Sequence, residues 1–296
     1  MLCLALLALF APQSTPQEVP SFSYDRSAPL EMEVKDLATR DGVRVSSISF
    51  AGPKGGRAEG MLVAPVGTRG KTGAIVWMHS GGAYENLPDA ILAAQIGAVS
   101  LILEPSSPDQ DPVVWRNSMI RSKVNIRRAV DILAAREDVD LRRIAFVGHS
   151  FGAMMGAVAA ADKRFKAAVF EVGLLGMSVH IRTSPHPWAA GARKDLGDKL
   201  DHFLTVIEPL DASHYIGQLS PTVLLFQSAR MDLGVPEKDT LDFYNAASEP
   251  KELRWYNSGH DVLDIAAISD RLRFLATQLG LQPVEPVLKR KIGLAN

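Results

Sequence analysis

Residues 144–161 read IAFVGHSFGAMMGAVAAA, and both the fold and the chemistry of the chain are inferred outward from this stretch. The apolar run 144–147 is typical of a buried strand, and the small residues of 152–161 are typical of a closely packed helix. Between them, GHSFG matches the pattern G-x-S-x-G, in which a serine occupies a sharp turn from strand to helix. The stretch therefore predicts that Ser150 is a nucleophile held clear of a sheet.

Apolar runs and amphipathic stretches alternate on both sides of this turn. The expected strands are residues 43–50, 60–64, 73–78, 98–103, 144–147, 167–170, 222–227 and 252–256. The expected helices are residues 87–96, 113–136, 152–161, 237–247 and 262–279. This alternation predicts an α/β fold, with a mostly parallel central sheet and helices on both of its faces. Residues 173–220 carry no clear strand, and we interpret them as a short helical lid insertion.

The composition is that of a globular protein, with 47% hydrophobic and 22% charged residues. We expect residues 31–296 to form a single domain, because its alternating pattern is continuous. The net charge is −1, from 32 basic and 33 acidic residues, and no basic block stands out. A nucleic-acid partner is therefore not expected. The sequence does not indicate an oligomeric state.

The N-terminus begins with an apolar run of 11 residues, MLCLALLALFA. A membrane-spanning helix needs about 20 residues, so no stable membrane insertion is expected. The run is typical of the core of a secretory signal peptide, although no Lys or Arg precedes it. We expect residues 1–11 to be a signal peptide and the protein to be secreted or periplasmic; it is cytoplasmic if the run is not a signal. Residues 12–30, rich in Pro, Ser and Gln, are predicted to form a loose arm.

A serine hydroxyl is a poor nucleophile at neutral pH and needs a base. The sequence SGH at 258–260 follows the last expected strand and precedes the last helix, which is where the base should lie in this topology. We therefore predict that His260 takes the proton from Ser150.

The imidazole in turn needs a carboxylate to orient it. Asp232 lies in MDLGVP, on the loop after the strand 222–227, and we predict that it has this role. Glu171, directly after the strand 167–170, is the alternative acid.

Acyl transfer also needs donors for the negative charge that develops on the substrate oxygen. One predicted donor is the backbone N–H of Phe151, the residue after the nucleophile. A second should come from HSGG at 79–82, which is close to the HGGG motif of esterases and lipases. We predict Gly81 as this donor, with Gly82 as the alternative.

These four segments, HSGG, GHSFG, the Asp232 loop and the SGH loop, resemble the α/β-hydrolase superfamily over residues 43–280. The order Ser150, Asp232, His260 is also the order in that superfamily. Within it the chain is similar to the branch of dienelactone hydrolases and acetyl esterases, and to the catalytic domain of prolyl-oligopeptidase-like peptidases. True dienelactone hydrolases have a cysteine nucleophile, and this chain has a serine.

Other residues that could bind ligands are interpreted structurally. Four histidines lie in the expected lid with separations that match no usual zinc site, so no metal is expected: His180, His186, His202 and His214. Three apolar lid residues could line a pocket for the acyl group, but packing against the sheet is preferred: Met177, Trp188 and Phe203. His149 is interpreted as a packing residue. The chain has neither a phosphate loop nor a dinucleotide fingerprint, so no cofactor is expected.

The resemblance and the residues together predict a serine hydrolase that cleaves a small-molecule carboxylic ester through an acyl-serine intermediate. A serine peptidase or amidase would use the same residues on a different bond. A non-catalytic binding protein on a hydrolase scaffold is the third possibility. A complete set of candidate residues argues against it.

Overall fold

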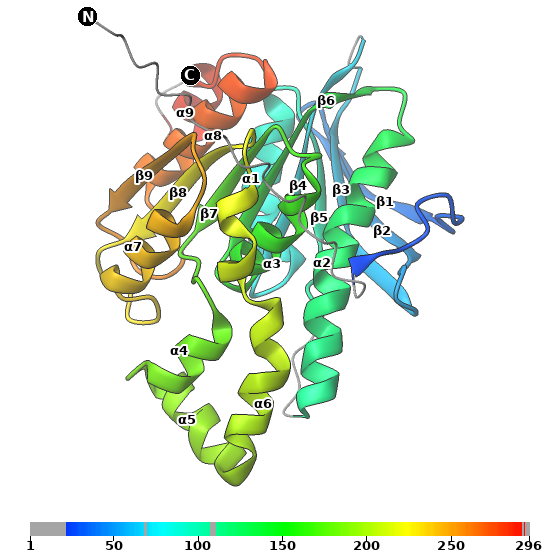
Figure 1. Cartoon of the computed structure of the whole chain (residues 1–296). Helices are drawn as coiled ribbons and strands as arrows, with labels where there is room; N and C mark the ends of the chain where they lie inside the picture. The colour runs from blue at the N-terminus through cyan, green and yellow to red at the C-terminus, as the bar shows by residue number, and fades with distance from the viewer. Residues whose placement is uncertain (1–21, 68–69, 107–110, 292, 294–296) are drawn as a thin grey trace, which may run out of the picture.

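A computed structural model describes residues 22–67, 70–106, 111–291 and 293. The expected signal peptide lies outside the described residues, as does the expected arm up to residue 21. Nine strands of the described chain form one sheet, in the order β1-β2-β3-β5-β4-β6-β7-β8-β9 (Figure 1). They are β1 Glu33–Arg40, β2 Val43–Ala51, β3 Arg57–Pro65, β4 Thr72–His79, β5 Val99–Leu103, β6 Val139–His149, β7 Ala167–Glu171, β8 Val223–Ala229 and β9 Lys251–Tyr256.

The sheet is mostly parallel, as the sequence predicts. Strands β1, β2 and β3 pair antiparallel, β3 also pairs antiparallel with β5, and every pair from β5 through β4 to β9 is parallel. The register places His79, His149, Glu171 and Gln227 side by side near the carboxyl ends of four adjacent strands. Loops that leave these ends therefore gather at one edge of the sheet, which is where ligands bind in such folds.

Helices cover both faces of the sheet, which confirms the expected α/β class. Helices α2 and α3 pack on one face, and α1 and α8 pack on the other. The helices are α1 Ala83–Gln95, α2 Pro112–Ala134, α3 Phe151–Ala159, α4 Met177–Thr183, α5 Pro187–Leu196, α6 Leu200–Ile207, α7 Glu237–Ala246, α8 Ile265–Leu279 and α9 Glu285–Lys291. Among the residues described, no helix is both long and apolar enough to cross a bilayer.

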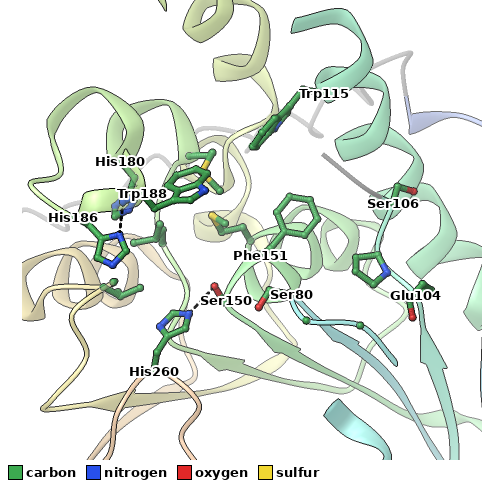
Figure 2. A pocket seen from close by; sticks show the side chains of 18 residues that line it. Ser80, Glu104, Ser106, Trp115, Ser150, Phe151, His180, His186, Trp188 and His260 are labelled. Atoms are coloured by element: carbon green, nitrogen blue, oxygen red, sulfur yellow. Dashed lines mark hydrogen bonds between the residues drawn. The ribbon is translucent and has the colours of Figure 1, made fainter. Parts of the chain in front are cut away.

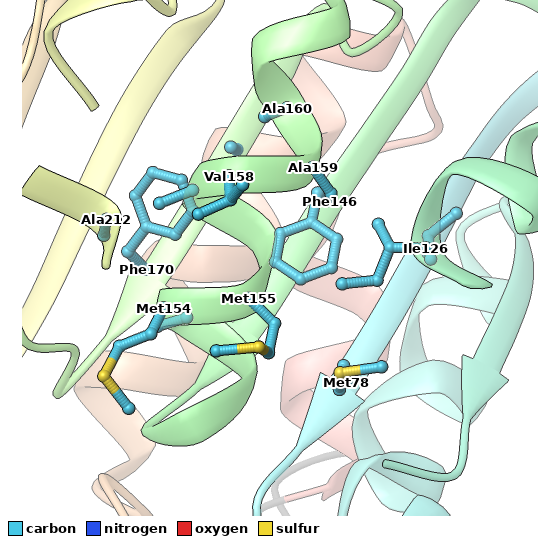
Figure 3. Close-up of a cluster of buried hydrophobic side chains, with 14 of the residues drawn as sticks. Met78, Ile126, Phe146, Met154, Met155, Val158, Ala159, Ala160, Phe170 and Ala212 are labelled. Carbon is cyan, nitrogen blue, oxygen red and sulfur yellow. The ribbon is translucent and has the colours of Figure 1, made fainter. Parts of the chain in front are cut away.

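Apolar side chains between the sheet and α3 fix the position of the nucleophile turn (Figure 3). Phe146 of β6 lies fully buried in this layer, beside Met155 and Val158 of α3. A Cβ atom on Gly156 would overlap the Phe146 ring, so glycine lets α3 lie directly on the strand. Burial on both faces explains why strands such as β4 and β6 show continuous apolar runs in the sequence.

The segment between β7 and β8 contains α4, α5 and α6, which contact one another. They project from the carboxyl edge of the sheet and lie beside one end of α2, with α6 in contact with that helix (Figure 1). We call these three helices the lid.

Among the strands and α-helices of the described chain, β1 and α9 have no counterpart in the sequence prediction. All residues of β1 are exposed, so EVKDLATR has no alternation of apolar and polar residues for a pattern to detect. Its place in the sheet comes from pairing with β2. Helix α1 also begins earlier than expected, at Ala83, and contains Pro88.

The described part of the expected loose arm, residues 22–30, is packed on α2, unlike the prediction. Phe22 is 1% exposed. The Tyr24 hydroxyl donates to Asp131 at 2.7 Å, and Arg128 donates to the carbonyls of three residues of the arm, Arg26, Ala28 and Pro29. Burial of an aromatic ring and these hydrogen bonds offset the entropy lost on ordering the segment.

Candidate active site

Ser150 lies at the turn from β6 to α3, with φ 53° and ψ −113°. Few residues other than glycine adopt positive φ, and such strain is concentrated at functional sites. The Ser150 N–H donates to the Glu171 carbonyl at 2.8 Å. A Cβ on Gly148 would lie 2.6 Å from the Gly152 carbonyl oxygen, and a Cβ on Gly152 would overlap the Met78 carbonyl oxygen. Both glycines of the motif are therefore required for the turn to close.

His260 reaches Ser150 from the loop between β9 and α8. Its Nε2 atom lies 3.0 Å from the Ser150 Oγ, and its Nδ1 atom lies 2.8 Å from Asp232 Oδ2. Figure 2 shows the imidazole directed at the serine. These distances are within the range that direct proton transfer requires. The structure thus brings together Ser150, Asp232 and His260, three residues separated by up to 110 positions.

Asp232 is held as a buried carboxylate, with a side chain that is 1% exposed. Its Oδ1 atom accepts the N–H groups of Gly234 and Val235 at 2.7 and 2.9 Å. Burial acts to raise the pKa of Asp232, but hydrogen bonds from His260 and these two amides outweigh it, so the pKa lies below its ordinary value. The ionised carboxylate keeps the imidazole proton on Nδ1, which leaves the Nε2 lone pair facing the serine hydroxyl.

Glu171, the alternative acid, is paired with a different residue. Its carboxylate forms an ion pair with Arg271 of α8, and both side chains are nearly fully buried. Arg271 also pairs with Asp89 and donates to Gln227 Oε1 at 3.1 Å. The carboxylate that hydrogen-bonds His260 is that of Asp232.

His149 has a contact that the sequence analysis missed. Its Nε2 atom lies 2.7 Å from the backbone carbonyl oxygen of His260, and the residue is 2% exposed. A carbonyl only accepts, so Nε2 carries the proton, and Nδ1 can accept the Ser80 hydroxyl at 3.4 Å. Burial, with a smaller effect of His79, lowers the pKa of His149 to about 3, so the ring is neutral. It stacks on His79 with centroids 3.9 Å apart.

Both glycines proposed as oxyanion donors have protein partners in this structure. The Gly81 N–H donates to the His79 Nδ1 at 2.9 Å, and the Gly82 N–H donates to the His79 carbonyl at 3.3 Å. Burial lowers the pKa of His79, which keeps its Nδ1 available as an acceptor. These local contacts follow from the tight turn after β4, in which Gly82 has φ 110°. Phe151 is in the first turn of α3, where an N–H has no intrahelical acceptor.

Ser150 and His260 lie in the wall of a cavity of about 430 Å³ between the sheet edge and the lid (Figure 2). One part of the wall is polar and includes Ser80, Glu104 and Ser106. The other part is largely apolar and comprises Trp115, Phe151, Met154, Leu174, Met177, Trp188 and Val235. A cavity of this size suits a small molecule.

Two lid histidines, His180 and His186, also line the cavity. The His186 Nδ1 accepts the Trp188 N–H at 3.2 Å and caps α5. The His180 Nδ1 lies 3.6 Å from Asp239, and burial lowers its pKa. Within the described chain, no three side chains of His, Cys, Asp or Glu gather as they would around a metal ion.

Several solved structures share this fold. The acetyl xylan esterase from Paenibacillus sp. R4 has a TM-score of 0.70 at 20% identity, over 84% of this chain and 89% of that one. Acetyl xylan esterase 1 from Thermoanaerobacterium sp. JW/SL YS485 has a TM-score of 0.67 at 16% identity, over 87% and 91%. The S-formylglutathione hydrolase from Agrobacterium tumefaciens has a TM-score of 0.62 at 14% identity, over 83% and 100%. No curated protein matches the sequence.

Fold and relatives define an α/β-hydrolase of the serine type, as the resemblance in the sequence implies. The sequence profile of the prolyl oligopeptidase family matches residues 124–281, more than half of the chain, and the chain belongs to this family. The matched region contains Ser150, Asp232 and His260.

Proposed function

We propose that this protein hydrolyses a carboxylic ester through an acyl-serine intermediate. The observation that carries the proposal is the continuous chain of hydrogen bonds from Asp232 through His260 to Ser150, in the wall of a cavity. The same chain of groups activates serine in many unrelated hydrolases.

In this mechanism the Ser150 Oγ attacks the ester carbonyl while the His260 Nε2 accepts the hydroxyl proton. Asp232 stabilises the imidazolium that forms, and its two backbone donors keep it ionised and fixed. His260 then gives the proton to the departing alcohol. A water molecule, deprotonated by His260, attacks the acyl-serine and releases the acid.

The tetrahedral oxyanion needs at least one strong donor, and we propose the Phe151 N–H for this role. The Gly81 N–H supplies the second hydrogen bond. It leaves the His79 Nδ1, to which it donates in the resting enzyme, and donates to the oxyanion instead. The exchange replaces a hydrogen bond to a neutral ring with a charge-assisted one, which is roughly twice as strong. It therefore favours the transition state over the resting enzyme, as catalysis requires.

The dimensions of the cavity favour a small ester as substrate. About 430 Å³ beneath three lid helices accommodates a compact molecule more readily than a long peptide. The alternative, a serine peptidase or amidase, is favoured by the family match. It would use the same three side chains.

A fluorophosphonate probe and two substrate series test the proposal. We expect the probe to label the wild-type protein and not Ser150→Ala, with both variants shown to be folded by circular dichroism. We expect p-nitrophenyl esters to be cleaved with higher kcat/KM than aminoacyl p-nitroanilides. Faster cleavage of the anilides would replace the esterase with the peptidase. Absence of labelling and turnover in folded wild-type protein would favour a binding protein.

A further inference from the structure

A second cavity, of about 270 Å³, lies between the lid and Trp115 of α2, beside the active-site cavity. The residues of its wall that matter here are Trp115, Ile181, Trp188, Gly191, Ala192 and Phe203. Trp115 and Trp188 also line the active-site cavity, so the two spaces are neighbours that share these indole rings. In Figure 2, Trp188 lies over the space beside Ser150, and Trp115 lies farther along it.

Most residues that line the second cavity are apolar, although the exposed Asp195 also lies in its wall, and two of them are tightly packed. Ile181 and Phe203 are each 1% exposed. Trp115 meets Phe203 edge to face at 5.4 Å between centroids, which holds the far side of the shared wall. Trp188 is different, because its side chain is half-exposed and its nearest ring, His180, is 6.3 Å away. The shared wall therefore has one firmly packed indole and one with fewer neighbours.

Glu104 and Ser106 lie on one side of Ser150 in the active-site cavity, and Trp188 lies on the other side with His180 and His186 beside it (Figure 2). Glu104, which is exposed, and Ser106 lie in the polar part of the wall. The apolar part leads by way of Trp115 and Trp188 toward the second cavity. In ester hydrolysis the alcohol leaves first, whereas the acyl group stays bonded to the serine until water attacks. The side that leads toward the mostly apolar second cavity therefore suits the acyl group, and the side of the exposed Glu104 suits the departing alcohol.

We infer that the second cavity is an acyl-chain site, and that the chain of a medium-length aliphatic ester passes between Trp115 and Trp188 to reach it. The inference rests on the proposed esterase function and names its substrate class, esters of aliphatic acids longer than butyric acid. Each further methylene that the cavity buries should strengthen binding roughly fourfold, which gives the longer chains their advantage.

Gly191 allows the cavity to be filled without disturbing the fold. It lies within α5 and lines the second cavity, and no atom lies within 4 Å of the position that its Cβ would occupy. Gly191→Leu therefore adds a side chain in open space. Ala190→Leu is the matched control, because residue 190 is exposed on the same helix and lines neither cavity. Ala192→Leu fills the second cavity from another position of its wall.

The experiment measures kcat/KM of the three variants and the wild type for p-nitrophenyl acetate, butyrate, hexanoate and octanoate. We expect the wild type to prefer hexanoate or octanoate. In Gly191→Leu and Ala192→Leu, the ratio of octanoate to acetate should fall at least tenfold, and in Ala190→Leu it should not change. An unchanged ratio in both filled variants, with normal melting temperatures, would overturn the inference.

A second substrate series separates the acyl group from the alcohol. Ethyl, butyl and octyl acetate vary only the leaving alcohol, so the filled variants should cleave them with the same relative rates as the wild type. A loss confined to octyl acetate would show that the cavity holds the alcohol and would contradict the inference. If the wild type cleaves no ester in either series, the proposed esterase function fails. If the wild type cleaves esters but the filled variants keep its chain-length preference, only the acyl-chain site fails.

Discussion

The Nε2 atom of His149 donates a hydrogen bond of 2.7 Å to the backbone carbonyl of His260. This contact joins the residue before the nucleophile to the loop that carries the base, across 111 positions of sequence. The side chain of His149 thereby fixes the backbone of His260, while Asp232 fixes its ring. Two independent contacts thus set the distance between the His260 Nε2 and the Ser150 Oγ.

Removing the His149 donor should slow the chemical step more than substrate binding. In His149→Phe the ring can still stack on His79, but no N–H remains for the His260 carbonyl. We expect kcat on p-nitrophenyl esters to fall roughly 10- to 100-fold, because displacements of about 1 Å cost this much, with little change in KM. His149→Gln, which restores a side-chain N–H donor, should recover part of kcat. Equal losses in the two variants would contradict a positioning role.

His149 should also make the stability of the protein depend on pH. Its pKa falls from an ordinary 6.5 to about 3 in the folded protein, so between these values the unfolded chain binds a proton that the native state does not. Its contribution is complete above pH 6.5 and is lost as the pH falls toward 3. Between about pH 7.5 and pH 5 the wild type should lose about 1–2 kcal/mol more unfolding free energy than His149→Gln. Urea denaturation at both pH values measures this difference, and parallel losses would refute it.

Asp232 and Glu171 should respond differently to the same change of carboxylate to amide. Asp232→Asn should lower kcat roughly 10,000-fold and leave the fold intact, because the imidazole loses its correct tautomer. Glu171→Gln should retain kcat within about tenfold and lower the unfolding free energy by about 1–3 kcal/mol, because Arg271 loses one buried partner. Kinetics and denaturation of both variants test the assignment. A larger loss of kcat in Glu171→Gln would reverse it.

Two glycine-to-alanine substitutions should have opposite effects on stability. In Gly152→Ala the new methyl group meets the Met78 carbonyl in the turn after Ser150, so we expect a loss of at least about 1–3 kcal/mol. In Gly191→Ala the methyl group enters open space within α5, and alanine should add up to about 1 kcal/mol. Melting temperatures of the purified variants report the sign of each change. A Gly152→Ala variant as stable as the wild type would contradict the close approach described above.

The parts of the fold that the sequence predicts are those in which burial leaves a pattern. Strands β4, β6 and β8 are covered on both faces, so their residues form apolar runs. Strand β1 is exposed throughout and is defined only by pairing with β2, which no local pattern encodes. The burial of Phe22 is likewise not predictable from the sequence, because a single aromatic residue in a polar segment forms no apolar pattern.

The three side chains of the site follow from topology, whereas the hydrogen bonds around them do not. Parallel strands bring their carboxyl ends to one edge, so residues after β6, β8 and β9 must lie near one another. The contact of His149 with a backbone carbonyl depends on which ring nitrogen carries the proton. The pairing of Gly81 with the His79 ring depends on the local turn. Neither of these two hydrogen bonds can be predicted from the spacing of residues in the sequence.

The ion pair between Glu171 and Arg271 has an evolutionary consequence. In a descendant whose orienting acid lay at the end of β7, Glu171 would be in the right position. Its carboxylate, however, is already paired with the guanidinium of Arg271 from α8. That guanidinium also forms an ion pair with Asp89 and a hydrogen bond to Gln227. Removing it would therefore leave both side chains without this partner. Relocating the acid to β7 would thus take simultaneous substitutions at Arg271 and at its partners Asp89 and Gln227.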